Sequence, residues 1–108
     1  MIMELLGHKD YLRILMALKK KPLRFTEIQK TLDLNPTQVD RALSFLRKGL
    51  WIIPQTLSTE KGPIRVEYSL GKRGVAFLAS WQSFQTQAER HEAELGKSEV
   101  AELQSLSR

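Results

Sequence analysis

The chain has 108 residues, a formal net charge of +5 and no cysteine. This length allows one domain with an appendage and a small packed core. The lack of cysteine excludes disulfides, thiolate catalysis and thiolate metal ligands. No segment is long and apolar enough to span a membrane, and the N-terminus lacks the apolar core of a signal peptide, so we expect a cytoplasmic protein.

The charge is distributed unevenly along the chain. Residues 1–75 carry 14 lysines and arginines against 7 acidic residues, whereas residues 76–108 carry 3 against 5. This difference predicts a basic domain over 1–75 and a separate C-terminal segment over 76–108. A basic domain favours a polyanionic partner, most often nucleic acid, but a lysine-rich protein without such a partner has the same composition.

The N-terminal third predicts two helices. The first spans residues 3–20, ends before Pro22 and has an apolar stripe made of Leu5, Tyr11, Leu12, Leu15 and Leu18. An extended link over 23–25 leads to a brief helix over 27–32. Thr26 is its predicted N-cap, and Gln29, three positions on, completes a capping box.

A tight turn over 33–35 leads to a third helix over 36–48. Asn35 is a good N-cap, Pro36 suits the first helical position and Gln38 stands third. Gly49 is a natural C-terminal stop. Two capped helices joined by a three-residue turn predict a helix-turn-helix.

The next segment predicts a β-hairpin. Residues 50–56 are apolar and β-branched, with Pro54 marking an edge or a bulge. Residues 64–70 alternate apolar and polar side chains, as a half-buried strand does. The polar stretch between them forms a loop, 57–65, that carries two cations, Lys61 and Arg65.

A long helix is predicted from Lys72 to about Leu95. Six of its residues follow one another in alternating steps of four and three, the spacing of a coiled-coil seam: Phe77, Trp81, Phe84, Ala88, His91 and Leu95. We therefore expect this helix to form a homodimer interface. Gly96 is predicted to break it, and Ser98 to cap a short terminal helix; whether residues 97–108 are ordered is left open.

The order of these elements predicts a mainly α (α+β) fold: a winged helix-turn-helix with a two-stranded wing and a long C-terminal dimerisation helix. Two elements of such a fold address double-stranded DNA, a helix in the major groove and a loop on the adjacent backbone. The domain over 1–75 is then the DNA-binding domain, and 76–108 is the dimerisation helix and tail.

The third helix has the two faces that this role requires. We expect one face to join the core, through Val39, Leu43, Leu46 and Leu50. Arginine can bond guanine edges, glutamine adenine edges, and hydroxyls either bases or phosphates. Side chains of these types occupy or flank the opposite face, namely Thr37, Gln38, Arg41, Ser44, Arg47 and Lys48. Any amphipathic helix has a polar face, but this one carries little negative charge, and we place Asp40 on its flank.

The stretches "RFTEIQKTL", "LNPTQVDRALSFLRKGLW" and "PIRVEYSLGKRG" resemble the HxlR-type winged-helix transcriptional regulators, over about residues 11–82. The "RVEYSL" segment is the most specific part. The resemblance implies a homodimer that binds operator DNA and represses or activates transcription. It also implies that Arg24 and Thr26 contact the DNA backbone, that 36–48 is the recognition helix, and that 61–65 is the wing.

The chain departs from that family at two places. Gly71 stands where the family has a threonine cap, so the cap of the last helix is weaker here or comes from elsewhere. The sensing cysteine of some family members is absent, so thiol chemistry cannot be the trigger of this protein.

Other functions have little support in the sequence. His8 and His91 are the only histidines and lie far apart, no catalytic set is evident, and "GKRG" lacks the pattern of a phosphate-binding loop. We therefore expect no enzyme activity, no metal and no cofactor. The alternative is a winged-helix protein-interaction module of a larger assembly, against which the basic charge of 1–75 favours DNA. The sequence does not specify an operator, a regulated gene or a small-molecule effector.

Overall fold

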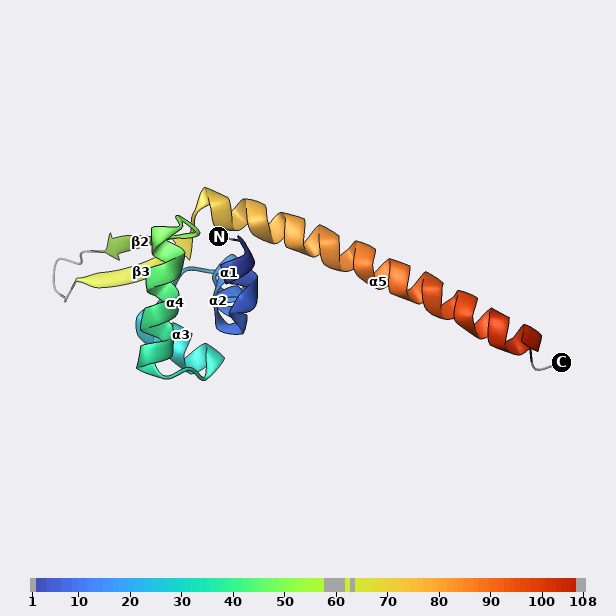
Figure 1. The fold of residues 1–108 in the computed structure, drawn as a ribbon. Coiled ribbons are helices and arrows are strands. Elements are labelled where there is room, and N and C mark those ends of the chain that lie inside the picture. The colour runs from blue at the N-terminus through green and yellow to red at the C-terminus, as the bar shows by residue number, and fades with distance from the viewer. Residues whose placement is uncertain (1, 58–61, 63, 107–108) are drawn as a thin grey trace. The chain divides into compact units, whose positions relative to one another are not determined.

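The computed structural model describes residues 2–57, 62 and 64–106, with side chains up to residue 97. The chain divides into two compact units, Met1–Leu78 and Ala79–Arg108. The elements, in chain order, are α1 (Ile2–Gly7), α2 (Lys9–Lys20), β1 (Leu23–Arg24), α3 (Phe25–Leu32), α4 (Pro36–Lys48), β2 (Ile52–Leu57), β3 (Arg65–Leu70) and α5 (Lys72–Leu106) (Figure 1). This confirms the predicted winged helix-turn-helix with a long C-terminal helix.

The N-terminal region differs from the prediction. The single helix expected over 3–20 is two helices, because His8 is extended at φ −116° and ψ 103°. Gly7, just before this break, has the weakest helix propensity of any residue but proline, so the interruption occurs where it costs least. The imidazole ring of His8 stacks on the ring of Tyr11 at 4.4 Å between centroids.

The start of α3 also differs. Thr26 was predicted to be the N-cap, but α3 begins at Phe25 and Arg24 occupies the cap position. The Glu27 carboxylate accepts hydrogen bonds from the Arg24 backbone N–H at 3.0 Å and from its Nε at 3.1 Å. The prediction failed because arginine has no side-chain acceptor and so is not a usual cap; here the acidic residue at the third helical position bonds the cap backbone instead.

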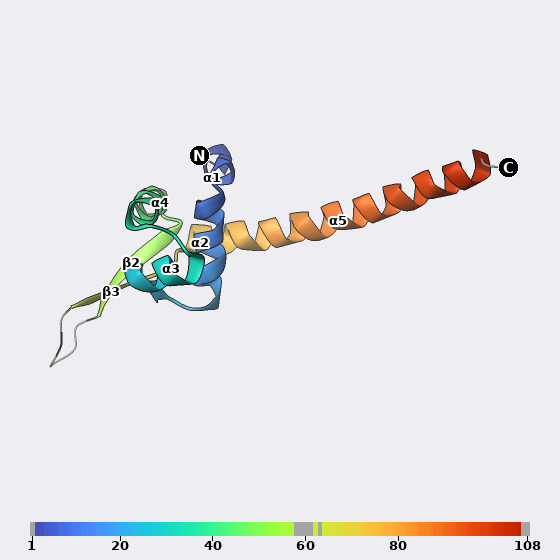
Figure 2. The ribbon, with the colours of Figure 1, turned by 90° about the horizontal axis from the view of Figure 1, so that it is seen from below.

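The predicted start and end of the second helix of the helix-turn-helix are confirmed. Asn35 Oδ1 accepts the Gln38 backbone N–H at 2.8 Å, and Gln38 Oε1 accepts the Asn35 backbone N–H at 2.9 Å. Pro36 opens α4, and Gly49 is its C-cap. Asp33 ends α3 in a left-handed conformation at φ 53°, which aspartate tolerates better than most residues. Figure 2 shows α2, α3 and α4 gathered in one group.

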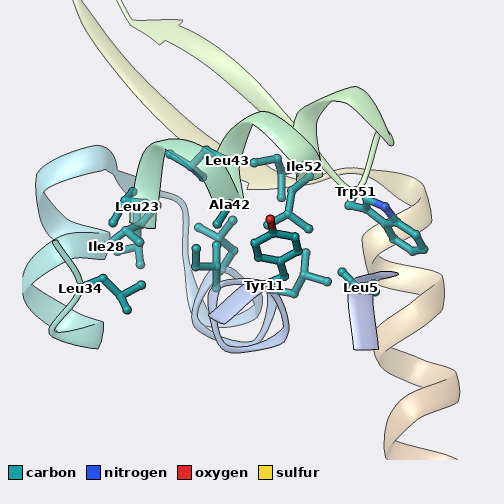
Figure 3. Packing of buried hydrophobic residues seen from close by; sticks show 14 of the residues in the cluster. Leu5, Tyr11, Leu23, Ile28, Leu34, Ala42, Leu43, Trp51 and Ile52 are labelled. Atoms are coloured by element: carbon teal, nitrogen blue, oxygen red, sulfur yellow. The ribbon is translucent and has the colours of Figure 1, made fainter. Parts of the chain in front are cut away.

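The core of Met1–Leu78 lies between the helices and the base of the sheet (Figure 3). Helix α4 contributes Val39, Ala42, Leu43 and Leu46 to it. Leu50, which was expected in this core, is instead 69% exposed and has φ 60°. The chain makes a left-handed turn there, which points Leu50 outward and brings Trp51 into the core with 1% of its surface exposed.

The sheet has three antiparallel strands in the order β1-β3-β2. The expected link over 23–25 contributes β1, whose Leu23 lies opposite Tyr68. The wing is the β2–β3 hairpin, paired from Ile52 opposite Leu70 to Leu57 opposite Arg65. Strand β3, which was expected to be half-buried along its length, is half-buried only near the core, since Ile64 and Val66 are exposed. Lys61 lies outside the described residues.

The beginning of α5 packs tightly against the chain that follows α4. The Gly71 N–H donates to the Trp51 carbonyl at 2.9 Å, and a Cβ at Gly71 would lie 2.6 Å from the Leu50 carbonyl oxygen. Arg73 donates from Nη1 to the Gly49 carbonyl at 2.8 Å, and its guanidinium lies 3.9 Å from the centre of a Trp51 ring. A threonine would therefore not fit at position 71 in this structure, which accounts for the departure noted in the sequence.

Helix α5 continues through Gly96 to Leu106. The predicted break at Gly96 and the separate helix after Ser98 are therefore wrong. One glycine costs a helix only about 1 kcal/mol relative to alanine, and the flanking Ala, Glu, Leu and Lys residues favour the helix.

Candidate nucleic-acid interface

The outer face of α4 is exposed, as the sequence analysis expected. Thr37, Arg41 and Lys48 on this face are exposed, Ser44 is half-buried, and Gln38 and Arg47 beside it are exposed. In the described part of the chain, no hydrogen bond or ion pair engages the side chains of Arg41, Arg47 or Lys48. Because the leucines of the inner face hold the helix in the core, three unpaired cations are held on a rigid element.

Two hollows run along the sides of this face. The larger, about 440 Å³, lies between α2 and α4, and Tyr11, Thr37, Asp40, Arg41, Ser44, Phe45 and Lys48 line it. The smaller, about 90 Å³, lies toward α3 and β3, and Phe25, Asp40, Leu43, Ser44, Arg47 and Tyr68 line it. Asp40 and Ser44 line both hollows, so they form the ridge between them.

Asp40 was placed on the flank of the helix because its charge is unfavourable near phosphate. The structure shows it exposed, one helical turn before Ser44, lining the hollow of Arg41 on one side and the hollow of Arg47 on the other. A residue on the flank of α4 therefore still borders the same hollows as the cations expected to meet DNA.

The side chain of Gln38 is already part of the cap of α4. Its Oε1 already accepts the Asn35 N–H of the capping box. If Gln38 bonded an adenine through both amide atoms, the same oxygen would accept two hydrogen bonds, one from the Asn35 N–H and one from the adenine amino group, which restricts how the amide can turn. Arg41, Thr37 and Ser44 have side chains that make no hydrogen bond within the described residues, so they can bond a base without losing a bond of the fold.

The predicted backbone-contacting residues lie on three other elements. Arg24 is half-buried and paired with Glu27 at 3.1 Å, so part of its charge is neutralised. Thr26 is exposed in the first turn of α3, and Arg65 is exposed at the start of β3. The bonds from the Arg24 backbone N–H, and then from its side chain, hold the pKa of Glu27 below its usual range.

The predicted dimer seam is only partly exposed. Phe77 lies in the first unit, where its ring meets Trp51 edge-on at 5.5 Å between centroids. Trp81 and Ala88 are half-buried, and the Trp81 ring stacks on Phe84 at 5.8 Å. Phe84 and Leu95 are 59% and 64% exposed, and His91 is also exposed. The seam thus leaves large apolar side chains uncovered on α5.

The described residues offer neither a membrane-spanning helix nor a cluster of metal ligands. None of the helices there combines the length and the hydropathy needed to cross a bilayer. No three His, Cys, Asp or Glu side chains in that part of the chain come together as a metal site.

The comparisons with known proteins agree with this geometry. A family model described as "Bacterial regulatory protein, arsR family" matches residues 8–49, which include the helix-turn-helix. A search of curated protein sequences finds no match.

Solved structures give a longer match. The reduced form of the transcriptional regulator YodB from B. subtilis is 28% identical, with a TM-score of 0.73 over 82% of this chain and 86% of that one. A putative MarR-family regulator from Enterococcus faecalis V583 is 21% identical, with a TM-score of 0.74 over 84% and 82%. A PadR-like transcription factor from "bacteroid fragilis" is 19% identical, with a TM-score of 0.67 over 82% and 90%. The chain is thus a winged helix-turn-helix protein similar to bacterial transcriptional regulators.

Proposed function

We propose that the protein is a sequence-specific DNA-binding transcriptional regulator of the HxlR type that acts as a homodimer in the cytoplasm. The observation that carries this proposal is the outer face of α4, where cations with unpaired side chains and the hydroxyl of Thr37 are exposed on a helix fixed by its buried leucines. In a helix-turn-helix, the second helix enters the major groove and its exposed side chains meet the base edges.

The roles of the individual residues follow from their chemistry. Arg41, near the middle of the face, bonds a guanine bidentately, and Thr37 and Ser44 bond bases or phosphates. Arg47 and Lys48 lie in the last turn and neutralise phosphates. The wing over 57–65, with Lys61 and Arg65, lies on the adjacent backbone, and Arg24 and Thr26 contact the backbone from the start of α3.

The homodimer rests on α5. The heptad spacing of the seam and the exposure of Phe84 and Leu95 favour pairing with the same surface of a second copy. Two α4 helices would then address half-sites about 34 Å apart on a pseudo-palindrome. No catalytic step and no cofactor belongs to this function.

A mobility-shift titration on random duplex DNA at low salt tests the proposal first. We expect retardation that weakens steeply as salt is added, since the basic domain displaces counterions from the phosphates. Absence of retardation at any salt concentration would contradict DNA binding and favour the protein-interaction module. Genomic footprinting with the purified protein would then locate the operator.

A further inference from the structure

Asp40 stands in an unexpected place for a DNA-binding surface. It is the only acidic residue of α4, it is exposed, and it lies on the ridge with Ser44. Two other acids of the winged domain are paired, Asp10 with Arg13 and Glu27 with Arg24. Asp40 has no such partner within the described part of the chain, although Arg41 lines the larger of its two hollows and Arg47 the smaller.

An unpaired carboxylate on this ridge opposes binding to every DNA sequence. It repels phosphates, and it repels the acceptor atoms that guanine and thymine present in the major groove. The cost is offset only where the DNA presents a donor. Cytosine presents its N4 amino group alone, whereas in adenine the N6 amino group stands next to the N7 acceptor, which repels the second carboxylate oxygen.

We propose that Asp40 determines specificity by accepting a hydrogen bond from the N4 amino group of one cytosine in each half-site. The proposal rests on the function proposed above and adds a base preference to it. The carboxylate weakens binding to sites with another base more than it strengthens binding to sites with cytosine, so its main effect is on specificity. Removing it relaxes the choice of base without weakening attachment to the backbone.

Selection of binding sites from a randomised duplex library tests this inference, with the full-length wild type and two variants. We expect one cytosine to be fixed in each wild-type half-site. Asp40→Ala loses that preference, binds random duplex at least as tightly as the wild type, and lowers the ratio of specific to random affinity roughly 10- to 100-fold. Asp40→Asn shifts the preference toward adenine, whose N6 and N7 suit an amide.

Asp33→Asn is the matched control. It removes the same charge from the turn before α4, and asparagine tolerates the left-handed conformation found there. The control should select the same sites as the wild type.

The outcomes separate the inference from the proposed function. If Asp40→Ala selects the wild-type sites, the inference is wrong although DNA binding stands. If Asp40→Ala weakens specific and random binding by the same factor, or lowers the unfolding midpoint, Asp40 has a structural role and the inference is again wrong. If the wild type binds no duplex, the proposed function fails and the inference with it.

Discussion

The core of the winged unit and the seam of α5 beyond that unit differ in how far their large apolar side chains are buried. In Met1–Leu78, Ile14, Leu46 and Trp51 have at most 1% of their surface exposed. In the second unit, Phe84 and Leu95 leave more than half of theirs in solvent, at 59% and 64%. The first set is committed to folding and the second is available for association. Substitutions in the core should therefore change the free energy of unfolding, and substitutions in the seam should change association.

Leu46→Ala should have the largest effect on folding. The side chain is fully buried on the inner face of α4, so its removal leaves a cavity and costs about 2–5 kcal/mol of the free energy of unfolding. Urea denaturation followed by tryptophan fluorescence measures this cost. A loss below about 1 kcal/mol would mean that α4 is not held by its leucines, and the fixed position of its outer face would be in doubt.

Phe84→Ala should act on association instead. If the seam pairs two copies, both lose a buried ring, and the dimer weakens by about 3 kcal/mol, or roughly 100-fold in Kd. Sedimentation equilibrium measures the Kd, and circular dichroism of the separated protomer should show an unchanged fold. An unchanged Kd would remove Phe84 from the interface.

Replacing a glycine by alanine should change the stability in opposite directions at two positions of α5. A Cβ at Gly74 would collide with the Trp51 carbonyl oxygen, so Gly74→Ala should destabilise the winged unit by about 1–3 kcal/mol. A Cβ at Gly96 meets nothing within 4 Å, so Gly96→Ala should stabilise the helix by about 0.5–1 kcal/mol. Thermal unfolding of both variants checks this, and equal shifts in one direction would contradict the close packing at Trp51.

The smallest effect should be on how the stability contributed by the start of α3 depends on pH. Because the folded-state pKa of Glu27 is lowered, its ionised form contributes stability that is fully present above its ordinary pKa and lost as pH falls through the lowered value. Glu27→Gln can still accept from the Arg24 N–H but does not titrate, so it should remove this part of the acid dependence. Urea titrations between about pH 2 and 6 measure it; identical profiles for wild type and variant would show that the bond has no net effect.

The features that could be predicted correctly from the sequence are those that depend on residues close together in the chain. The capping box of Asn35 and Gln38 and the stop at Gly49 depend on neighbours within four residues, and they were predicted correctly. Arg24 and Leu50 were missed because their conformations depend on distant contacts, the pairing of β1 with β3 and the burial of Trp51. The flank position of Asp40 follows from the helical spacing, whereas its place in both hollows depends on the elements packed around α4.

The most direct test of the central claim compares Arg41→Ala with Arg90→Ala. Each removes one exposed arginine from a helix, the first from the outer face of α4 and the second from the α5 region beyond the winged unit. Operator and random-duplex affinities are measured by fluorescence anisotropy at one salt concentration. The account predicts that Arg41→Ala loses about 1–3 kcal/mol on the operator and relaxes one base position, while Arg90→Ala stays close to the wild type. Unchanged operator affinity and preference in Arg41→Ala, or an equal loss in Arg90→Ala, would contradict it.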